Sequence, residues 1–425
     1  MTHWYPIGAQ LTARDLWVDV PLDWSEPEGS SIRVFAREVV DATKRDDDLP
    51  LLVYLQGGPG GKSPRPLGND GFIASATKRF RVVLPDQRGT GRSTPLTGRD
   101  VAGLSAEAGA HLLSLYRADS IIRDFEALRQ VHYAGRPWVT LGQSYGGFLT
   151  LHYLSQAPEA VVASAITGGL PSIEPDPAVV YARTFPRIEA KNLEFQARHP
   201  HLTSRIARVA DVLQSSEVRL PSGDRLTVRR LQTLGLDFGM KPGYDRVHWL
   251  FDEAFADREE TTLSDTFVTE VEAATSFATN PLFIALQESI YGSGPSNWAA
   301  QRERDRRPQF DEARRPLLFT GETVFPWMFE EIGPLRGFQA AVDRLASQEV
   351  PIEMYDPARL AANEVPIEAA VYFDDMYVDA GLSLETVERV AHLNAWVTNE
   401  FEHDGLRLGD VAERLFQNLE VRLGG

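Results

Sequence analysis

Leu141-Gly142-Gln143-Ser144-Tyr145-Gly146-Gly147 is the stretch of this chain that decides its fold. It follows a short apolar run at residues 138–141 and precedes residues 148–156, which are predicted to be helical. A strand, a sharp turn and a helix form the context in which the serine of G-x-S-x-G acts as a nucleophile. The glycines two residues before and two residues after Ser144 avoid Cβ clashes in the strained turn. The sequence therefore predicts a nucleophilic serine at position 144.

Other short apolar runs flank this motif, at residues 51–55, 81–85 and 162–167. Continuous runs of this length are typical of strands buried on both faces of a parallel sheet. Residues 120–133 carry apolar side chains at helical spacing and predict a helix before the motif. Residues 16–22 and 32–40 alternate apolar and polar side chains around a turn, which predicts a β-hairpin. The pattern indicates an α/β fold with a mostly parallel central sheet.

The strand pattern disappears between residues 168 and 347, a segment that is predicted to be mostly helical. Strand-like runs return at residues 367–373 and 395–401, with a helical pattern at 384–395. We therefore expect one sheet interrupted by a helical cap domain. The predicted division is a first core part at 1–167, the cap at 168–347 and a second core part at 348–425.

Composition excludes several classes of protein. Without cysteine there are no disulfides, no thiolate nucleophile and no Cys-ligated zinc, and a reducing compartment is favoured. The net charge of −17 argues against nucleic acid as a partner. The basic stretch at residues 302–307 is interrupted by acids and is interpreted as a solvated helix face.

No apolar run is long enough to cross a membrane and the N-terminus lacks signal-peptide features, so we expect a cytoplasmic protein. Nothing in the sequence indicates an oligomeric state.

A glycine-rich loop, Gln56-Gly57-Gly58-Pro59-Gly60-Gly61, follows the first central strand. In the predicted fold this loop lies beside the serine and can turn N–H groups toward it. We expect an oxyanion hole made by the Tyr145 N–H and by the N–H of Gly57 or Gly58. A phosphate-binding loop is excluded, because the glycine required five residues before Gly61 is Gln56.

Three motifs together resemble those of prolyl aminopeptidases (proline iminopeptidases), which have the α/β-hydrolase fold. They are Gln56-Gly57-Gly58-Pro59-Gly60-Gly61, Asp86-Gln87-Arg88-Gly89-Thr90-Gly91-Arg92-Ser93 and Gly142-Gln143-Ser144-Tyr145-Gly146-Gly147. They match H-G-G-P-G, D-Q-R-G-x-G-x-S and G-x-S-[WY]-G-G, and the long cap is similar to that of the larger bacterial branch. Gln56 departs from the usual histidine of the first motif. Asp86 and Arg88 are interpreted as structural residues near the active site.

The predicted fold requires the order serine, acid, histidine along the chain. The chain has nine histidines. His152 lies eight residues down the helix from Ser144, about 12 Å along its axis, and is too far away to act as the general base. Two candidates follow the cap: His392, within the predicted helix 384–395, and His403, just after the last strand-like run. His403 occupies the loop position that a general base needs, and it matches the family's late histidine.

Two neighbouring aspartates, Asp374 and Asp375, follow the strand predicted at 367–373. Adjacent side chains at a strand end point to opposite sides, so one of the two should face the imidazole. The family's acid directly precedes a methionine, as Asp375 does here, and this resemblance favours Asp375. Asp374 stays open as the alternative.

The resemblance implies cap glutamates that bind the substrate's amine. Glu288, in a helix predicted to begin at Asn280-Pro281, and Glu322 both lie among apolar residues, where a carboxylate needs a partner or a function. A salt bridge with a cap arginine is the structural alternative for each. Candidates for the wall of a proline pocket are Phe277, Tyr291, Phe325 and Trp327, although aromatic residues at such positions are more often core.

The sequence and the resemblance predict a serine aminopeptidase that releases N-terminal proline from short peptides through an acyl-enzyme. No metal or cofactor is expected. Two alternatives stay open: a capped esterase or lactonase that uses the same triad, and a non-catalytic ligand-binding protein.

Overall fold

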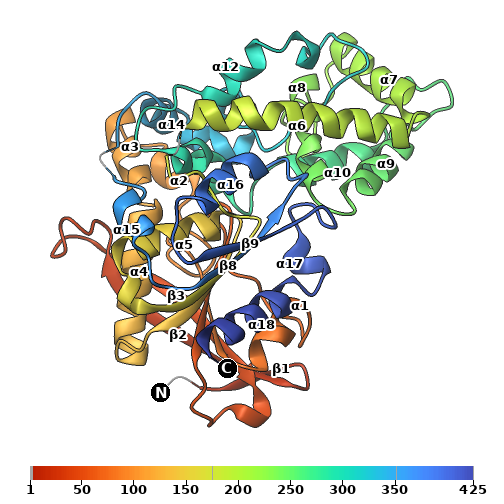
Figure 1. Cartoon of the computed structure of the whole chain (residues 1–425). Coiled ribbons are helices and arrows are strands. Elements are labelled where there is room, and N and C mark those ends of the chain that lie inside the picture. Colours follow the sequence, from red (N-terminus) through yellow and green to blue (C-terminus); the bar gives the residue numbers. More distant parts are fainter. Residues whose placement is uncertain (1–2, 175, 351, 425) are drawn as a thin grey trace.

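A single nine-stranded sheet runs through the lower part of the molecule (Figure 1). The computed structural model describes residues 3–174, 176–350 and 352–424. The strand order is β1-β2-β3-β5-β4-β6-β7-β8-β9. The strands are β1 (Tyr5–Ile7), β2 (Leu11–Pro21), β3 (Ser31–Asp41), β4 (Leu51–Leu55), β5 (Arg81–Pro85), β6 (Trp138–Gln143), β7 (Val161–Thr167), β8 (Ile367–Tyr372) and β9 (Leu393–Thr398).

The pairing confirms the predicted mostly parallel sheet. Strands β5, β4, β6, β7, β8 and β9 pair in parallel, whereas β1, β2 and β3 form an antiparallel extension that joins β5. Strands β4 and β5 have the predicted bounds, and the β2–β3 hairpin is longer than predicted. Strand β6 continues to Gln143, so the sheet extends to the residue before Ser144.

Helices cover both faces of the sheet. On one face, α18 lies against β7 and β8 and contacts α1, which lies against β5; on the other, α5 lies against β6 and α4 against β2 (Figure 1). The helices of the core parts are α1 (Gly71–Thr77), α2 (Gly98–Val101), α3 (Ala106–Ser114), α4 (Ala118–Tyr133), α5 (Tyr145–Gln156), α15 (Pro357–Ala361), α16 (Ala380–Val387), α17 (Gly405–Leu408) and α18 (Val411–Leu423).

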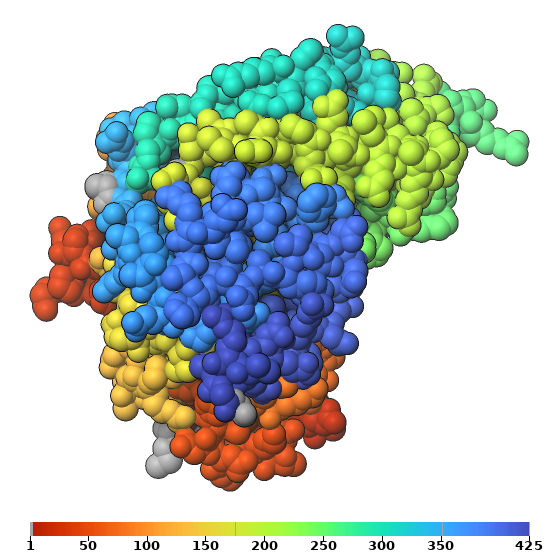
Figure 2. Space-filling view, viewed as in Figure 1, coloured from red at the N-terminus to blue at the C-terminus, as the bar shows by residue number. Residues whose placement is uncertain are grey.

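The segment between β7 and β8 is helical and forms the upper layer in Figure 1. In the space-filling view this layer covers the C-terminal part of the core and projects beyond it on one side (Figure 2). Its helices are α6 (Pro177–Arg198), α7 (Leu202–Ser215), α8 (Val228–Gln232), α9 (Gly243–Asp252), α10 (Asp265–Thr275), α11 (Pro281–Leu286), α12 (Ala299–Asp305), α13 (Met328–Glu331) and α14 (Gln339–Ala346). We refer to this layer as the cap. The exact boundaries at 167/168 and 347/348 stay a prediction.

The predicted bounds of two elements near the C-terminus were wrong. The helix expected at 384–395 is α16, which ends at Val387, and the last strand is Leu393–Thr398 rather than 395–401. His392 therefore lies in a turn with φ of 57°, and its carbonyl accepts the Ile367 N–H at 3.0 Å. Strand β9 is the last of the sheet, and its half-exposed side chains lack the continuous apolar pattern of the central strands.

The segment 302–307, predicted to be a solvated helix face, is only partly helical and only partly exposed. Helix α12 ends at Asp305, and Glu303 is buried between Arg306 and Arg307, with which it forms ion pairs. None of the described helices is both long enough and apolar enough to cross a membrane.

Candidate active site

Ser144 lies in the tight turn between β6 and α5 with φ of 56° and ψ of −126°. A non-glycine residue with positive φ is strained, and such strain is typical of functional turns. The Ser144 N–H donates to the Thr167 carbonyl of the neighbouring strand β7 at 3.1 Å, which fixes the turn to the sheet. Tyr145 is the first residue of α5, so its N–H has no acceptor within the helix and can serve a ligand.

The glycines of the motif are required by close backbone contacts. A Cβ atom on Gly142 would lie 2.4 Å from the Gly146 carbonyl oxygen, and one on Gly146 would lie 1.8 Å from that of Leu55. Both distances are far below van der Waals contact. Strand β4, the turn and α5 therefore approach one another at a distance that only glycine permits.

The glycine-rich loop after β4 lies beside the serine. A Cβ atom on Gly57 would be 2.9 Å from Ser144 Cβ, and Gly58 has φ of 131°. Gln87 holds the loop from both sides: its Nε2 donates to the Gln56 carbonyl at 2.7 Å, and its Oε1 accepts the Gly60 N–H at 3.1 Å. The loop is thus placed to offer an N–H to an oxygen bound at Ser144.

Asp86 and Arg88 fix the surrounding turn, in agreement with their structural interpretation. Asp86 accepts two hydrogen bonds from Arg65, at 2.8 and 2.6 Å, and one from the Arg92 N–H at 2.9 Å. Arg88 forms a fully buried, bidentate pair with Asp124 at 2.7 and 2.6 Å.

Asp375 and His403 meet at the carboxyl ends of the last two strands. His403 Nδ1 lies 2.6 Å from Asp375 Oδ2, and both side chains are buried. The other carboxylate oxygen, Oδ1, accepts the N–H groups of Tyr377 at 2.8 Å and Val378 at 3.2 Å. The Tyr377 ring stands edge-on to the imidazole at 4.8 Å. The aspartate is therefore held rigidly and orients the imidazole.

Burial alone would lower the pKa of His403. The hydrogen-bonded Asp375 carboxylate and the nearby Glu322 carboxylate act in the opposite direction and prevail, so the pKa of His403 lies above its ordinary value. The site thus stabilises the imidazolium that forms when the histidine accepts a proton.

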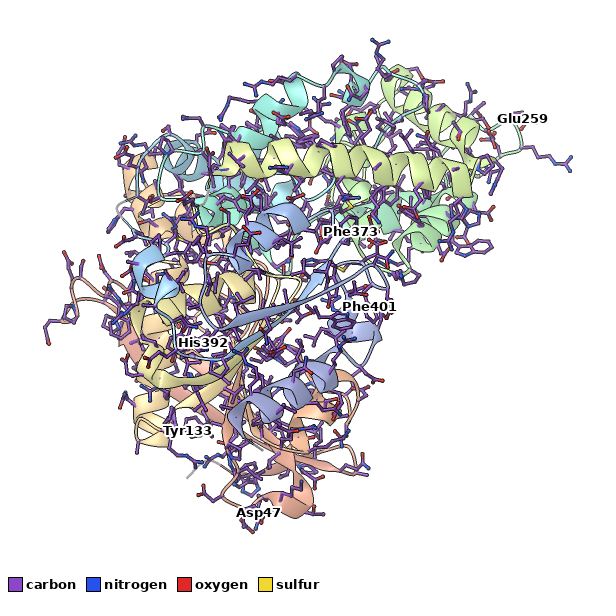
Figure 3. All side chains as sticks on the ribbon, viewed as in Figure 1. Asp47, Tyr133, Glu259, Phe373, His392 and Phe401 are labelled. Carbon is purple, nitrogen blue, oxygen red and sulfur yellow. The ribbon has the colours of Figure 1, made fainter. Side chains whose placement is uncertain are left out.

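The alternative residues lie elsewhere. Asp374 is turned away and pairs with Arg187 at 2.9 Å, and its side chain is 38% exposed against 1% for Asp375. His392 is exposed, far along the sheet from the cap (Figure 3). His152 is buried in α5, with Nδ1 against the Met354 carbonyl at 2.6 Å.

The end of strand β8 faces the cap. In Figure 3, Phe373, just after β8, lies directly beneath the cap.

One cavity of about 380 Å³ contains both Ser144 and His403. Its volume suits a small ligand. The core contributes Gln56, Gly57, Gly58, Gly61, Gln143, Ser144, Tyr377, His403 and Arg407 to its wall; the cap contributes Leu236, Met240, Ala273, Ala274, Ser276, Phe277, Ala278, Thr279, Asn280, Phe283 and Glu322.

Among the described residues, Glu322 is the one carboxylate on this wall. Burial raises the pKa of Glu322 to about 7; the charge of Asp375 acts in the same direction, and His403 opposes it. A carboxyl group poised in this way ionises readily when a cation arrives. The cavity therefore offers a binding position for an ammonium group.

Glu288, the other predicted cap glutamate, does not reach this cavity. It lies in the 3-10 turn Gln287–Tyr291 that follows the short helix α11, and it accepts the N–H groups of Ala299 at 3.2 Å and Ala300 at 2.8 Å. Its carboxylate thus satisfies the N-terminus of α12. This role differs both from amine binding and from the arginine pair that was the alternative.

Of the four aromatic residues predicted for the wall, Phe277 lines the Ser144 cavity and the other three do not. Tyr291 is buried against Tyr181 and Phe148, and Phe325 stacks on Trp327 with ring centres 6.0 Å apart. None of these three predicted residues lines the Ser144 cavity, and they are part of the packing beneath and within the cap. The aromatic side chains of the cavity are Phe277, Phe283 and Tyr377.

Sequence reasoning missed several residues of the cavity, among them Phe283, Asn280, Met240 and Arg407. No local motif marks them, because the three cap residues and Arg407 of α17 reach the site only through tertiary packing. Gln87 could have been found, since it lies within the second family motif.

The cap is fastened to the loop that carries the histidine. The His403 N–H donates to the Gly239 carbonyl at 2.9 Å, and the Lys241 N–H donates to Asp404 Oδ2 at 2.6 Å. Two consecutive residues of the histidine loop therefore hold residues 239–241 of the cap.

A serine after β6, an acid after β8 and a histidine after β9 define the chain as an α/β-hydrolase, and the family model of the alpha/beta hydrolase fold matches residues 50–319. A proline iminopeptidase of Aeromonas sobria is 43% identical over 403 residues, which cover 94% of each chain. Proline iminopeptidase aneH of Aspergillus aculeatus is 32% identical over 417 residues, covering 95% of this chain and 93% of that one. The chain belongs to the proline iminopeptidase family. A solved proline iminopeptidase of Mycobacterium smegmatis shares 14% identity over 96% of this chain and 100% of its own, with a TM-score of 0.44.

Proposed function

We propose that this protein is a serine aminopeptidase that removes N-terminal proline from short peptides. The observation that carries the proposal is the shared cavity: Ser144, His403 and the Glu322 carboxyl all line it, and Asp375 is hydrogen-bonded to His403. The near relatives named proline iminopeptidase support the same reaction.

In the first step Ser144 Oγ attacks the carbonyl carbon of the proline residue while His403 Nε2 takes the hydroxyl proton. The negative oxygen that forms accepts hydrogen bonds from the N–H of Tyr145 and from that of Gly57 or Gly58. His403 then donates its proton to the leaving amine nitrogen, the C–N bond breaks, and the shortened peptide departs. A prolyl ester remains on Ser144.

In the second step water attacks this ester and gives a proton to His403. The bond between Oγ and the acyl carbon breaks, Ser144 regains its proton from His403, and free proline leaves. Asp375 holds the imidazole through Nδ1 in both steps and stabilises its positive charge.

The proline end of the substrate is recognised by charge and by shape. Glu322 pairs with the secondary ammonium of the N-terminal proline, while Phe277 and Phe283, whose ring centres are 6.2 Å apart, pack against the pyrrolidine ring. The cap covers the cavity and limits access to short peptides. Residues farther from the N-terminus face the opening.

The test compares two substrates and one variant. Proline p-nitroanilide should be cleaved with a higher kcat/KM than p-nitrophenyl esters without an amine, because only the first engages Glu322. Ser144→Ala should abolish proline release and labelling by a fluorophosphonate. Preference for the esters would indicate an esterase, and absence of labelling in the unmodified protein would indicate a non-catalytic binding protein.

We further propose that the enzyme acts in the cytoplasm. The absence of cysteine supports this location, because the chain forms no disulfides and has no need of an oxidising compartment. Fractionation of the producing cells tests the location: activity against proline p-nitroanilide should follow a cytoplasmic marker, and activity in the medium or periplasm would contradict it.

A further inference from the structure

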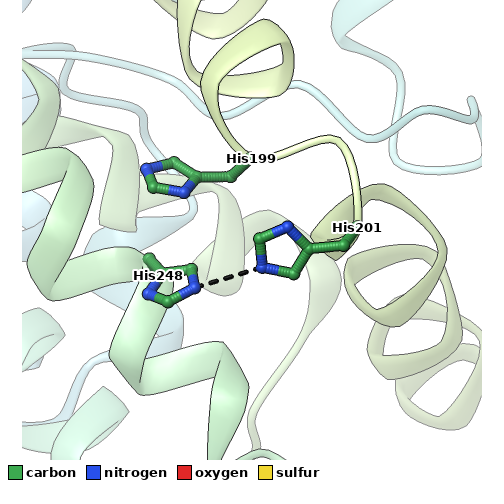
Figure 4. A group of neighbouring side chains, drawn as sticks. All are labelled: His199, His201 and His248. Carbon is green, nitrogen blue, oxygen red and sulfur yellow. Dashed lines mark hydrogen bonds between the residues drawn. The ribbon is translucent and has the colours of Figure 1, made fainter.

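Three imidazoles gather in the cap (Figure 4), and none of them lines the Ser144 cavity. His199 directly follows α6, His201 directly precedes α7, and His248 lies in α9. One ring nitrogen of each can be chosen so that all three lie within 4.8 Å of one another. In the part of the chain that the structure describes, this is the one group of three or more potential ligands that meets that criterion.

The spacing is close to that of a metal site. His201 Nε2 and His248 Nε2 lie 3.1 Å apart. Two imidazole nitrogens bound to one tetrahedral Zn²⁺ at about 2.0–2.1 Å are separated by roughly 3.3 Å. His199 stacks on His248 with ring centres 4.7 Å apart. A small movement of the His199 ring would bring its nitrogen to the same distance from the other two.

The carboxylate of Asp245 lies next to His199. His199 Nε2 is buried without a hydrogen-bond partner and lies 4.0 Å from Asp245 Oδ1. Arg198 holds the same carboxylate at 3.2 Å. Metal-bound histidines usually donate their second ring N–H to a carboxylate, which fixes the ring. When Nδ1 of His199 binds the metal, Nε2 carries the proton and Asp245 is placed to accept it.

We propose that His199, His201 and His248 bind one divalent transition-metal ion, Zn²⁺ in the first instance, with water as the remaining ligand. Neutral imidazoles without thiolates are typical donors for Zn²⁺, Ni²⁺ and Cu²⁺. His201 is exposed, so the ion can reach the site from solvent. Because the three ligands lie at the end of α6, at the start of α7 and within α9, the ion ties these helices together. The site is structural and takes no part in the reaction at Ser144.

The direct test is calorimetric titration of the full-length, EDTA-treated protein with Zn²⁺. One equivalent should bind, and His201→Asn should weaken binding at least about tenfold, since it removes one ligand from an exposed position. The matched control is His111→Asn, which alters an exposed histidine of α3 and should bind Zn²⁺ like the unmodified protein. Fluorophosphonate labelling of Ser144 shows that each variant is folded. Absence of stoichiometric binding, or equal binding by His201→Asn, would overturn the proposal.

A spectroscopic measurement locates the ion. Trp249 stands next to His248, with ring centres 4.5 Å apart. One equivalent of Cu²⁺, a strong binder of nitrogen ligands, should quench part of the tryptophan fluorescence. That quenching should be lost in Trp249→Phe and in His201→Asn and kept in His111→Asn. Quenching that persists in Trp249→Phe would place the ion elsewhere and contradict the proposal.

Discussion

The Glu322 carboxyl and the His403 imidazole line the same cavity, and each favours the charged form of the other. The negative charge of Glu322 raises the pKa of His403, and the imidazolium lowers the pKa of Glu322. One group is proposed to bind the substrate's amine and the other to accept the serine proton. Binding and catalysis are therefore electrostatically coupled, which pH measurements can detect.

The first prediction concerns the pH dependence of ester hydrolysis, in which no substrate amine titrates. His403 must be neutral to accept the Ser144 proton, so kcat/KM should rise as the pH passes upward through the pKa of His403. That midpoint should lie above the ordinary histidine value of about 6.5. Glu322→Gln removes a negative charge and should move the midpoint downward. An unchanged midpoint, or an upward shift, would contradict the coupling.

The second prediction separates amine binding from chemistry. Glu322→Gln should raise KM for proline p-nitroanilide about 10- to 100-fold, the loss expected for a charged hydrogen bond, and should change ester hydrolysis much less at a pH where His403 is neutral. Glu330→Gln, at an exposed position of α13, is the control and should behave like the unmodified enzyme. Equal losses on both substrates would assign Glu322 to a different role.

The third prediction distinguishes the two neighbouring aspartates. Asp375→Asn should lower kcat by about 10³- to 10⁴-fold, because the amide no longer fixes the imidazole tautomer or stabilises its charge. Asp374→Asn breaks only a partly exposed pair with Arg187 and should change kcat less than about threefold. Steady-state kinetics with proline p-nitroanilide measures both. The reverse order would make Asp374 the orienting acid.

The fourth prediction concerns the turn at Ser144. Gly146→Ala places a methyl group 1.8 Å from the Leu55 carbonyl oxygen, so β4 and α5 must separate. We expect a loss of at least about 1–3 kcal/mol in the free energy of unfolding, together with reduced fluorophosphonate labelling. Gly68→Ala, where the added methyl group meets no atom within 4 Å, should leave both properties nearly unchanged. Denaturant titration measures the stability of each variant.

The fifth prediction concerns the buried ion pair of Arg88 and Asp124. Arg88→Met leaves a carboxylate buried without its partner and should cost about 3–5 kcal/mol of unfolding free energy. Arg33→Met, which breaks an exposed pair with Asp19, should cost less than about 1 kcal/mol. Similar losses in the two variants would show that the buried pair has no special weight.

Much of the core could be predicted because its signals are local. Strands β4 and β5 are continuous apolar runs, and their predicted bounds agree with the structure. Ser144 follows a strand that the sequence marks clearly, and Asp375 and His403 follow the last two strands. The predicted position of strand β9 was displaced by a few residues, because the strand is half-exposed and follows residues with a helical pattern.

The cap side of the site could not be predicted in the same way. Glu288 and Glu322 both occur among apolar residues, and the difference between them is the N-terminus of α12, which lies 11 residues after Glu288 and satisfies only that carboxylate. Likewise nothing local separates Phe325, which is packed within the cap, from Phe283, which faces the cavity. Which side chain reaches the cavity depends on how distant helices pack.

The two hydrogen bonds that join residues 239–241 to His403 and Asp404 have a mechanical consequence. A swing of this cap segment away from the core would pull on the backbone of the proton acceptor itself. The position of this cap segment and the position of the imidazole are thus linked through the backbone. The packing of one cap segment therefore helps to set where the imidazole lies relative to Ser144.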